Sequence, residues 1–268
     1  MSDVIWLSEA QMRRIEPYFP LSHGVPRVDD RRVLSGIVFV IRNGLRWRDA
    51  PAEYGPHKTI YNRFIRWSRL GVFNRIFAGL AAEGGPPDQL MIDATHLKAH
   101  RTAASLLKKG AQRVNDPPDR CRIRFAPRRI GRTKGGLNSK LHAICDERGR
   151  PRVMLLSEGQ MSDYSGAALM LDAMPDAPVL IGDRGYDADW LRQALRARGI
   201  RPCIPGRAGR TIPIRHGKNT YRDRHRIEIM FGRLKDWRRI HTRYDRCAHT
   251  FMSAIAIAAV MLFWMPKQ

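Results

Sequence analysis

Residues 220–237 read TYRDRHRIEIMFGRLKDW, and the rest of the chain is interpreted from this stretch. No proline interrupts it, and its first glycine is Gly232. Its apolar residues recur with the i, i+3, i+4, i+7 spacing of an amphipathic helix. They are Ile227, Met230, Phe231 and Leu234. We therefore predict a single helix across the stretch, with Thr220 capping its start.

One face of this predicted helix carries polar residues of mixed charge. At about 100° per residue, its members fall within roughly 60° of one another. They are Tyr221, Arg224, Glu228 and Lys235. Glu228 is the only acid in the middle of a strongly basic helix, and such a carboxylate can hold a divalent metal ion. The alternative is an ordinary solvated face on which Glu228 forms salt bridges.

Positive charge is concentrated in two windows of the 268-residue chain, whose formal net charge is +23. Residues 98–140 contain 13 Lys and Arg against 2 acids, and residues 201–246 contain 14 against 4. Such windows predict surfaces that bind a polyanion, most simply nucleic acid. The hydrophobic content of 43% is that of a folded protein and excludes a largely disordered chain.

Cysteine usage and apolar segments bear on the compartment. The four cysteines are far apart and form no C-x-x-C pair, which argues against a zinc ribbon or a redox motif and favours reduced thiols. No N-terminal signal peptide is visible. The apolar stretch 248–265 is interpreted as a buried helix rather than a membrane span. The expected location is the bacterial cytoplasm, in association with the nucleoid.

Residues 1–83 are predicted to form a small all-helical domain. Helices are expected at about 8–18, 29–43, 57–70 and 72–82 from their caps and apolar stripes. A helix, a turn and then a basic helix indicate a helix-turn-helix DNA reader, although a helical bundle with a solvated basic face fits the spacing equally well. The side chains expected to contact DNA here are Lys58, Asn62, Arg63 and Arg66.

Residues 88–268 show a different pattern, beyond a predicted linker at residues 84–87. Strands are expected at 89–93, 140–145, 152–156, 179–183 and 201–204, and helices at 163–173 and 187–198. The second and third strands would form a hairpin around residues 146–149. Strands alternating with helices predict an α/β sheet covered on both faces, with a basic insertion at about residues 101–138.

Two acids stand at the expected carboxyl ends of apolar strands, where ligands gather in open α/β sheets. They are Asp93 and Asp183. Either alone is an ordinary turn acid, but together with Glu228 they would form a three-carboxylate cluster. Oxygen ligands of this kind favour Mg²⁺ or Mn²⁺ over zinc. In a chain with two cationic windows, such a cluster points to two-metal phosphodiester chemistry.

These motifs closely resemble those of the DDE transposases of bacterial insertion sequences, in the group that includes the insertion sequence numbered five. The resemblance rests on Asp93 in MIDATH, Asp183 in IGDRGYD, and the spacing Tyr221-x2-Arg224-x3-Glu228-x6-Lys235. Segments 131–151 and 238–259 are similar to the same group, as are LSEAQMRRIEPYFP and GLRWRDAPAEYGPHKTIYNRFIRW near the N-terminus. The resemblance therefore covers nearly the whole chain.

The resemblance implies an RNase H-like core, a mixed sheet with flanking helices, behind a helical DNA-binding domain. It implies Mg²⁺-dependent cleavage and rejoining of DNA at terminal inverted repeats by a homo-oligomer, with neither a membrane nor a small-molecule substrate involved. Asp93, Asp183 and Glu228 would bind metal, and Arg224, Lys235 and Tyr221 would act beside them. Further DNA contacts are expected from Lys98, Arg101, Lys134 and Arg238.

Residues 111–129 depart from this family because the connection is longer than usual. The segment is either a tolerated basic loop or the scar of a frameshift, and it removes none of the three acids. Two other functions stay open on the sequence. One is a non-catalytic DNA-binding protein, such as a decayed or truncated element, and the other is a nuclease that cuts without rejoining.

Overall fold

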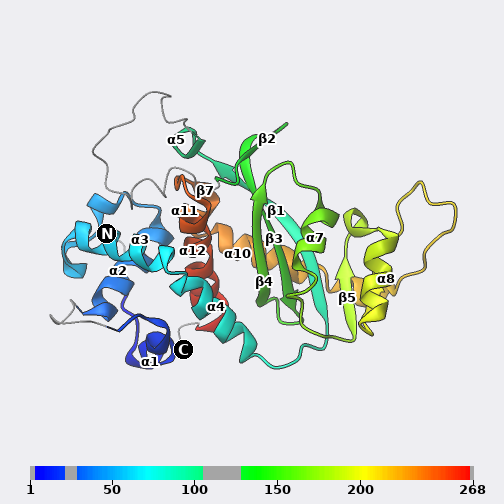
Figure 1. Ribbon diagram of the computed structural model, residues 1–268, viewed down its shortest axis with the longest axis horizontal. Coiled ribbons are helices and arrows are strands. Elements are labelled where there is room, and N and C mark those ends of the chain that lie inside the picture. The colour runs from blue at the N-terminus through cyan, green and yellow to red at the C-terminus, as the bar shows by residue number, and fades with distance from the viewer. Residues whose placement is uncertain (1–3, 22–28, 105–127, 266–268) are drawn as a thin grey trace. The chain divides into compact units, whose positions relative to one another are not determined.

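The computed structural model describes residues 4–21, 29–104 and 128–265, which fall into two compact units (Figure 1). The first unit contains residues 1–77, 98–129 and 234–268, and the second contains residues 78–97 and 130–233. Each unit therefore draws on segments that are distant in sequence. The predicted division into domains 1–83 and 88–268 stays a prediction, and residues 105–127 of the predicted basic insertion lie outside the described residues.

Helices make up most of the first unit. The N-terminal ones are α1 (Glu9–Ile15), α2 (Asp30–Asn43), α3 (His57–Arg69) and α4 (Val72–Ala82), with 3-10 turns at Glu16–Tyr18, Trp47–Asp49 and Ala52–Tyr54. Ser8 and Gln11 form the predicted capping box of α1, and Asp29 caps α2. Helix α2 ends at Gly44, whose φ of 67° is the left-handed conformation that favours glycine. All four predicted N-terminal helices are confirmed.

The C-terminal segment completes the core of this helical unit. It consists of α11 (Arg238–His241), β7 (Thr242–Arg243), α12 (Ala248–Ala259) and a π-helical turn over Val260–Trp264. Helix α12 packs against α2 and α3, and Ile37, Phe64 and Ile255 from these three helices are fully buried. The predicted burial of residues 248–265 is confirmed for most of them. Among the described helices, none is long and apolar enough to cross a membrane.

A mixed sheet forms the centre of the second unit. Its strands are β1 (Leu90–Ala99), β2 (Gly131–Thr133), β3 (Gly136–Asp146), β4 (Pro151–Glu158), β5 (Val179–Gly182) and β6 (Arg201–Cys203). The strand order is β2-β3-β1-β5-β6, and β4 also pairs with β3. Strands β3 and β4 form the predicted antiparallel hairpin, whereas β1, β5 and β6 run parallel. The last residues of β1, Lys98 and Ala99, pair with β7 inside the helical unit.

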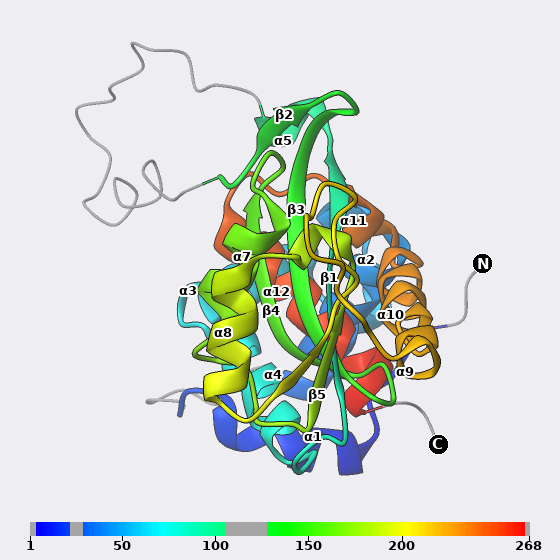
Figure 2. The same ribbon diagram turned by 90° about the vertical axis from the view of Figure 1, so that its right-hand side faces the viewer.

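Helices lie on both sides of this sheet. Helices α7 (Asp163–Met170) and α8 (Asp189–Ala197) pack on one face, where Met170 and Leu191 join Leu90, Ile92 and Leu180 in one buried core. Figure 2 shows α9 (Lys218–Arg222) and α10 (His225–Lys235) on the opposite side of the sheet. The predicted α/β fold class is confirmed as a mixed sheet with flanking helices, together with an N-terminal helical region.

The stretch 220–237 is not one helix, which corrects our prediction. Helix α9 begins after Gly217, so Thr220 lies inside a helix and caps nothing, and a turn at residues 223–224 separates α9 from α10. The side chain of Asp223 is engaged there by the Gln89 amide at 2.9 Å and faces Arg226 at 3.4 Å. The apolar stripe that predicted the helix is buried as expected, from Ile227 to Leu234.

Three further boundaries differ from prediction. Strand β1 continues six residues beyond Asp93 to Ala99, because the alternation of exposed His96 and Lys98 with buried Leu97 extends the strand. Helix α7 is capped by Ser162, so Asp163 is its first residue rather than its cap. Residues 131–133, which precede the strand expected at 140–145, form strand β2 against β3.

Candidate active site

Strand register places Asp93 beside Asp183. The parallel pairing of β1 with β5 ends with Ile92 opposite Gly182, so each acid is the next residue on its strand. Neighbouring strands lie about 4.8 Å apart, and the two acids therefore leave the sheet side by side where the strands diverge. The two carboxylates are close enough for their charges to interact, and the charge of Asp183 raises the pKa of Asp93. Ligand sites are common at such diverging carboxyl ends.

The Asp93 carboxylate is mostly buried, with 18% of its side chain exposed. Its oxygens accept hydrogen bonds from the Ala94 N–H at 2.7 Å and from Arg224 Nη1 at 3.0 Å. Burial raises its pKa to about 6, against the lowering effect of those two donors, and the charges of Asp183 and Asp163 add to the rise. Asp93 is thus a carboxylate held where negative charge accumulates, a common property of functional sites.

Arg224 connects Asp93 with Glu228. One guanidinium nitrogen donates to Asp93 and the other donates to Glu228 Oε1, four residues further along the chain. Glu228 therefore does form the salt bridge within the helical segment that the sequence left open as an alternative, and 53% of its side chain is exposed. However, the same guanidinium also reaches a strand residue 131 positions away, so the helix acid faces the strand acid instead of turning away from it.

Asp183 turns the chain into a short 3-10 segment, Arg184–Tyr186, by accepting a hydrogen bond from the Gly185 N–H at 2.8 Å. A Cβ at Gly185 would lie 2.9 Å from Asp183 Oδ1 and 3.1 Å from Asp163 Oδ2. The carboxylates of Asp183 and Asp163 thus border the same small space, which only a glycine leaves open. Asp163 also forms an ion pair with Lys140 Nζ at 2.6 Å.

Asp163 and Lys140 are neighbours of the site that the sequence did not reveal. In the sequence, Asp163 stands at the start of the helix expected at residues 163–173, where an acid commonly has the role of a cap. The signal that distinguishes the two roles is spatial, because the start of α7 and the turn after β5 meet only in the fold.

The structure bears on metal binding in two ways. Among the residues it describes, no group of three or more His, Cys, Asp or Glu side chains is gathered closely enough to hold a metal ion. The predicted cluster is therefore not assembled, because mutual repulsion separates carboxylates and the charge that holds Asp93 and Glu228 is that of Arg224. The donor set nevertheless fits Mg²⁺ or Mn²⁺, since its oxygens all come from carboxylates and one of them, Asp183, borders the space that Gly185 leaves open.

The remaining two predicted catalytic residues are Tyr221, which precedes Arg224 in the sequence, and Lys235, which follows Glu228. Tyr221 is partly buried in α9, with its ring edge on His216 at a centroid distance of 5.3 Å. Lys235 ends α10, two helical turns beyond Glu228, and it is assigned to the helical unit. Burial lowers the pKa of Lys235.

The residues predicted to contact DNA are mostly exposed, with one exception. On α3, Lys58, Asn62 and Arg66 face solvent. Arg63 is different, because only 15% of its side chain is exposed, and it faces Asp30 at 3.6 Å and the Trp67 ring at 5.4 Å. Its contacts are those of a packing residue. The others are exposed, namely Lys98, Arg101, Lys134 and Arg238.

Family models place this chain among known proteins. The model described as "Transposase DDE domain" matches residues 84–263, and the model described as "Putative transposase of IS4/5 family" matches residues 7–77. Because the first match covers more than half of the chain, the chain belongs to the DDE-domain transposase family. It is accordingly an enzyme of the transposase type.

Individual relatives agree with this assignment. The chain is 30% identical over 200 residues to the "Putative transposase for insertion sequence element IS402" of Burkholderia cepacia, which covers 65% of this chain and 92% of that relative. It is 30% identical over 131 residues to the "Putative transposase for insertion sequence element IS6501" of Brucella ovis, over 47% of this chain and 98% of that one. Among solved structures, the Mos1 transposase paired-end complex matches with a TM-score of 0.27 and 10% identity, over 85% of this chain and 86% of that chain.

Proposed function

We propose that this transposase catalyses Mg²⁺-dependent cleavage of DNA and strand transfer at the terminal inverted repeats of its own insertion sequence. The observation that carries the proposal is the Arg224 guanidinium, which binds both Asp93 and Glu228. Asp93 on β1 and Glu228 on α10, which are distant in sequence, are thereby held by one cation, and the strand register places Asp183 beside Asp93. A solvated helix salt bridge alone would not include Asp93.

In this proposal Asp93, Asp183 and Glu228 hold the metal ions, with Mn²⁺ as a substitute. Bound divalent ions would activate the attacking water or hydroxyl and stabilise the departing oxygen. The partly buried position of Asp93 limits access of bulk water to its carboxylate. Asp183 is oriented by the Gly185 N–H, which fixes one of its oxygens and leaves the other directed elsewhere.

Arg224 has two roles in this arrangement. Without DNA it neutralises Asp93 and Glu228, and with DNA it would turn to a phosphate oxygen, since guanidinium groups bind carboxylates and phosphates through the same forked geometry. Lys235 and Tyr221 are proposed to contact the DNA beside it. The exposed residues Lys58, Asn62 and Arg66 on α3 would bind the element end. Paired ends require a homo-oligomer on the DNA.

The test uses Glu228→Gln, which keeps the shape of the side chain and removes its charge. We expect cleavage of duplex DNA from the element's own end to fall at least about 10³-fold in Mg²⁺, because a metal ligand is lost, while affinity for the same DNA stays within about threefold. Glu53→Gln is the matched control, since Glu53 is exposed and lies in the helical unit.

Retained cleavage by Glu228→Gln would refute the assignment of Glu228. Product analysis separates the remaining alternatives. A transposase joins a 3′-hydroxyl end to target DNA, a nuclease stops at hydrolysis, and a non-catalytic protein binds DNA with salt sensitivity and without metal dependence.

A further inference from the structure

A basic cavity lies at the edge of the sheet, where edge strand β6 meets α8 and the segment that leads into α9. Its volume is about 400 Å³. Four arginines and a histidine line it, and no acid does. We call these five residues the basic pocket: Arg192, Arg196, Arg201, Arg215 and His216.

One arginine of the basic pocket is fixed by the protein and three are not. The Arg192 side chain is 4% exposed and donates to Asp187 Oδ1 at 2.9 Å and to the Ile204 carbonyl at 2.8 Å. Arg196, Arg201 and Arg215 are exposed, and within the described ranges their side chains form neither an ion pair nor a hydrogen bond. Three guanidinium groups around one cavity therefore have no counter-charge.

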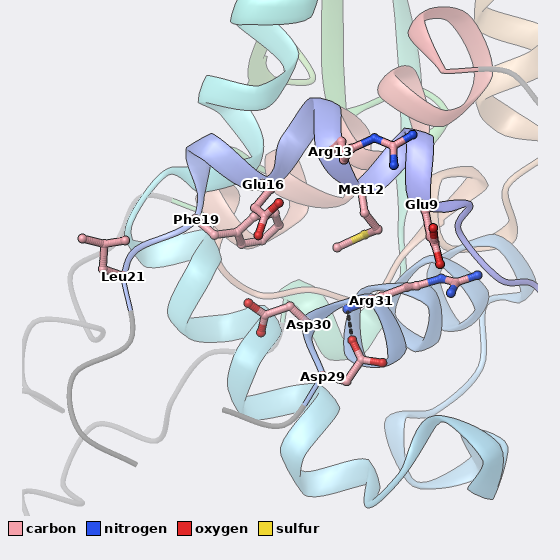
Figure 3. A pocket seen from close by; sticks show the side chains of 9 residues that line it. All are labelled: Glu9, Met12, Arg13, Glu16, Phe19, Leu21, Asp29, Asp30 and Arg31. Atoms are coloured by element: carbon pink, nitrogen blue, oxygen red, sulfur yellow. Dashed lines mark hydrogen bonds between the residues drawn. The ribbon is translucent and has the colours of Figure 1, made fainter. Parts of the chain in front are cut away.

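This lack of acids is not general in the molecule, despite its net charge. The helical unit contains a cavity of about 540 Å³ lined by both signs (Figure 3). Its charged lining residues are Glu9, Glu16, Asp29, Asp30, Arg13 and Arg31. Its acids outnumber its arginines, whereas the basic pocket has four arginines, one histidine and no acid. The absence of acids from the basic pocket therefore does not follow simply from the net charge of the chain, and it is suited to binding an anion.

The chemistry of the basic pocket selects a phosphate. Guanidinium forks bind phosphate oxygens through paired hydrogen bonds, and gathered cations repel one another until an anion neutralises them. The lining also contains the Thr220 hydroxyl and the apolar side chains of Pro202 and Ile214. The His216 imidazole is the one aromatic ring among the lining residues, against four arginines. This composition favours the phosphate group as the part of a nucleic acid that the basic pocket binds.

We propose that the basic pocket binds a phosphate group of the DNA backbone at a place separate from the three carboxylates. The proposal rests on the proposed function only in taking DNA as the ligand. The connection to the candidate active site is short, because the segment through Arg215 and His216 continues into α9, and Arg224 follows that helix by two residues. A phosphate bound in the basic pocket would thus restrain the segment that leads through α9 to Arg224.

The experiment compares two double variants that remove equal charge. Arg201→Gln/Arg215→Gln empties the pocket of two exposed cations. Arg46→Gln/Arg148→Gln removes two cations elsewhere, with exposed side-chain fractions of 69% and 72%. Binding of the element-end duplex is measured by fluorescence anisotropy without divalent metal, across a salt series. We expect the pocket variant to bind about tenfold more weakly and to reduce the slope of log K against log salt by about 1 to 2. The control should bind within about twofold of the unsubstituted protein.

The second measurement locates the contact on the DNA. Single neutral methylphosphonates are placed one at a time along the duplex. The unsubstituted protein should lose affinity at one or two positions, and the pocket variant should lose nothing more at those positions, because the partner arginines are already absent. Melting temperatures within about 2 °C of the unsubstituted protein show that the exposed substitutions left the fold intact.

Each outcome decides the proposal independently of catalysis. Equal DNA affinity of the pocket and control variants overturns it, even if cleavage by the unsubstituted protein supports the proposed function. Weaker binding by the pocket variant alone supports it, even if no cleavage is seen. Titration with inorganic phosphate and ATP distinguishes the source. If the pocket variant loses millimolar phosphate or ATP binding but keeps its DNA affinity, the cavity serves a free phosphate compound and the proposal is wrong.

Discussion

Asp183 and Asp187 lie four residues apart in the segment IGDRGYD, yet their surroundings are opposite. The Asp187 carboxylate has no exposed surface, and it accepts hydrogen bonds from Arg192, from Arg210 and from the backbone N–H of Arg207. In the part of the chain that the structure describes, the Asp183 carboxylate accepts one hydrogen bond, from the Gly185 N–H. The protein thus supplies hydrogen-bond donors to both oxygens of Asp187, whereas one carboxylate oxygen of Asp183 stays available to bind a ligand.

The difference shows how to separate structural acids from candidate ligands in one motif. Burial by itself would raise the pKa of Asp187, but the hydrogen bonds from Arg210, from the Arg207 N–H and from Arg192 outweigh it and hold this pKa well below its usual range. At Asp93 burial prevails and raises the pKa to about 6. Carboxylates whose charge the protein fully compensates hold loops in place. Carboxylates that it compensates only in part are suited to binding a cation.

The largest expected effect is the loss of cleavage in Asp183→Asn. The substitution removes one proposed metal ligand, so single-turnover cleavage in Mg²⁺ should fall at least about 10³-fold. The free energy of unfolding should change by less than about 1 kcal/mol, because the Gly185 N–H can still donate to the amide oxygen. Strong destabilisation of the variant would show that Asp183, like Asp187, is a structural acid, and it would contradict the proposed difference between the two residues.

Asp187→Asn should have the reverse profile. It leaves the buried Arg192 without its counter-charge and removes one of the two acids that pair with Arg210, which keeps Asp189, and we expect about 3–5 kcal/mol of destabilisation in urea unfolding. The control is Asp176→Asn, which breaks the Arg198 pair where 85% of the acid is exposed and should change stability by less than about 1 kcal/mol. Equal effects of the two substitutions would mean that the Asp187 network does not stabilise the loop.

A smaller effect concerns His142, a buried imidazole. It has a hydrogen-bond partner on one of its two ring nitrogens and is therefore intermediate between Asp187 and Asp183. Its Nε2 pairs with Ser157 Oγ at 2.8 Å, whereas its Nδ1 has no partner in the described structure. Burial, helped by the charge of Lys140, lowers its pKa to about 4. The folded state therefore resists protonation, so stability is complete above the unfolded pKa of about 6.5 and is lost as pH falls toward 4.

The measurement is the free energy of unfolding from pH 7 to pH 4 for the unsubstituted protein and for His142→Gln. The difference between the two should shift by about 3 kcal/mol over this interval, in the direction that favours the variant at low pH. Taking the difference cancels other groups, including Asp93, whose raised pKa acts in the opposite direction. A pH-independent difference would show that His142 has the same pKa in the folded and unfolded states.

Local patterns predicted most of the fold. Helix α4 and strand β5 were placed almost to the residue, because an unbroken apolar stripe and a short apolar run between turns are local signals. The end of β1 was missed because an acid directly after three apolar residues is typical of a strand end. The break after Arg222 was missed because Asp223 is held there by Gln89, a contact across 134 residues.

The site was predictable as a set of residues and not as a geometry. Spacing singled out Asp93, Asp183, Arg224 and Glu228, but it did not indicate that Arg224 would lie between two of the acids. The position of Asp163 depends on how α7 meets the turn after β5, and the anchoring of Arg210 by Asp187 depends on a loop that returns over 23 residues. Both are consequences of tertiary packing that no local pattern encodes.

The most direct test of the account is an anomalous difference map from crystals of the protein with its element-end DNA and Mn²⁺. We predict a Mn²⁺ peak coordinated by Asp93 and Asp183, with Glu228 beside it and Arg224 moved from these carboxylates to a DNA phosphate. A map in which Arg224 still bridges Asp93 and Glu228, with no Mn²⁺ peak at Asp93 or Asp183, would contradict it.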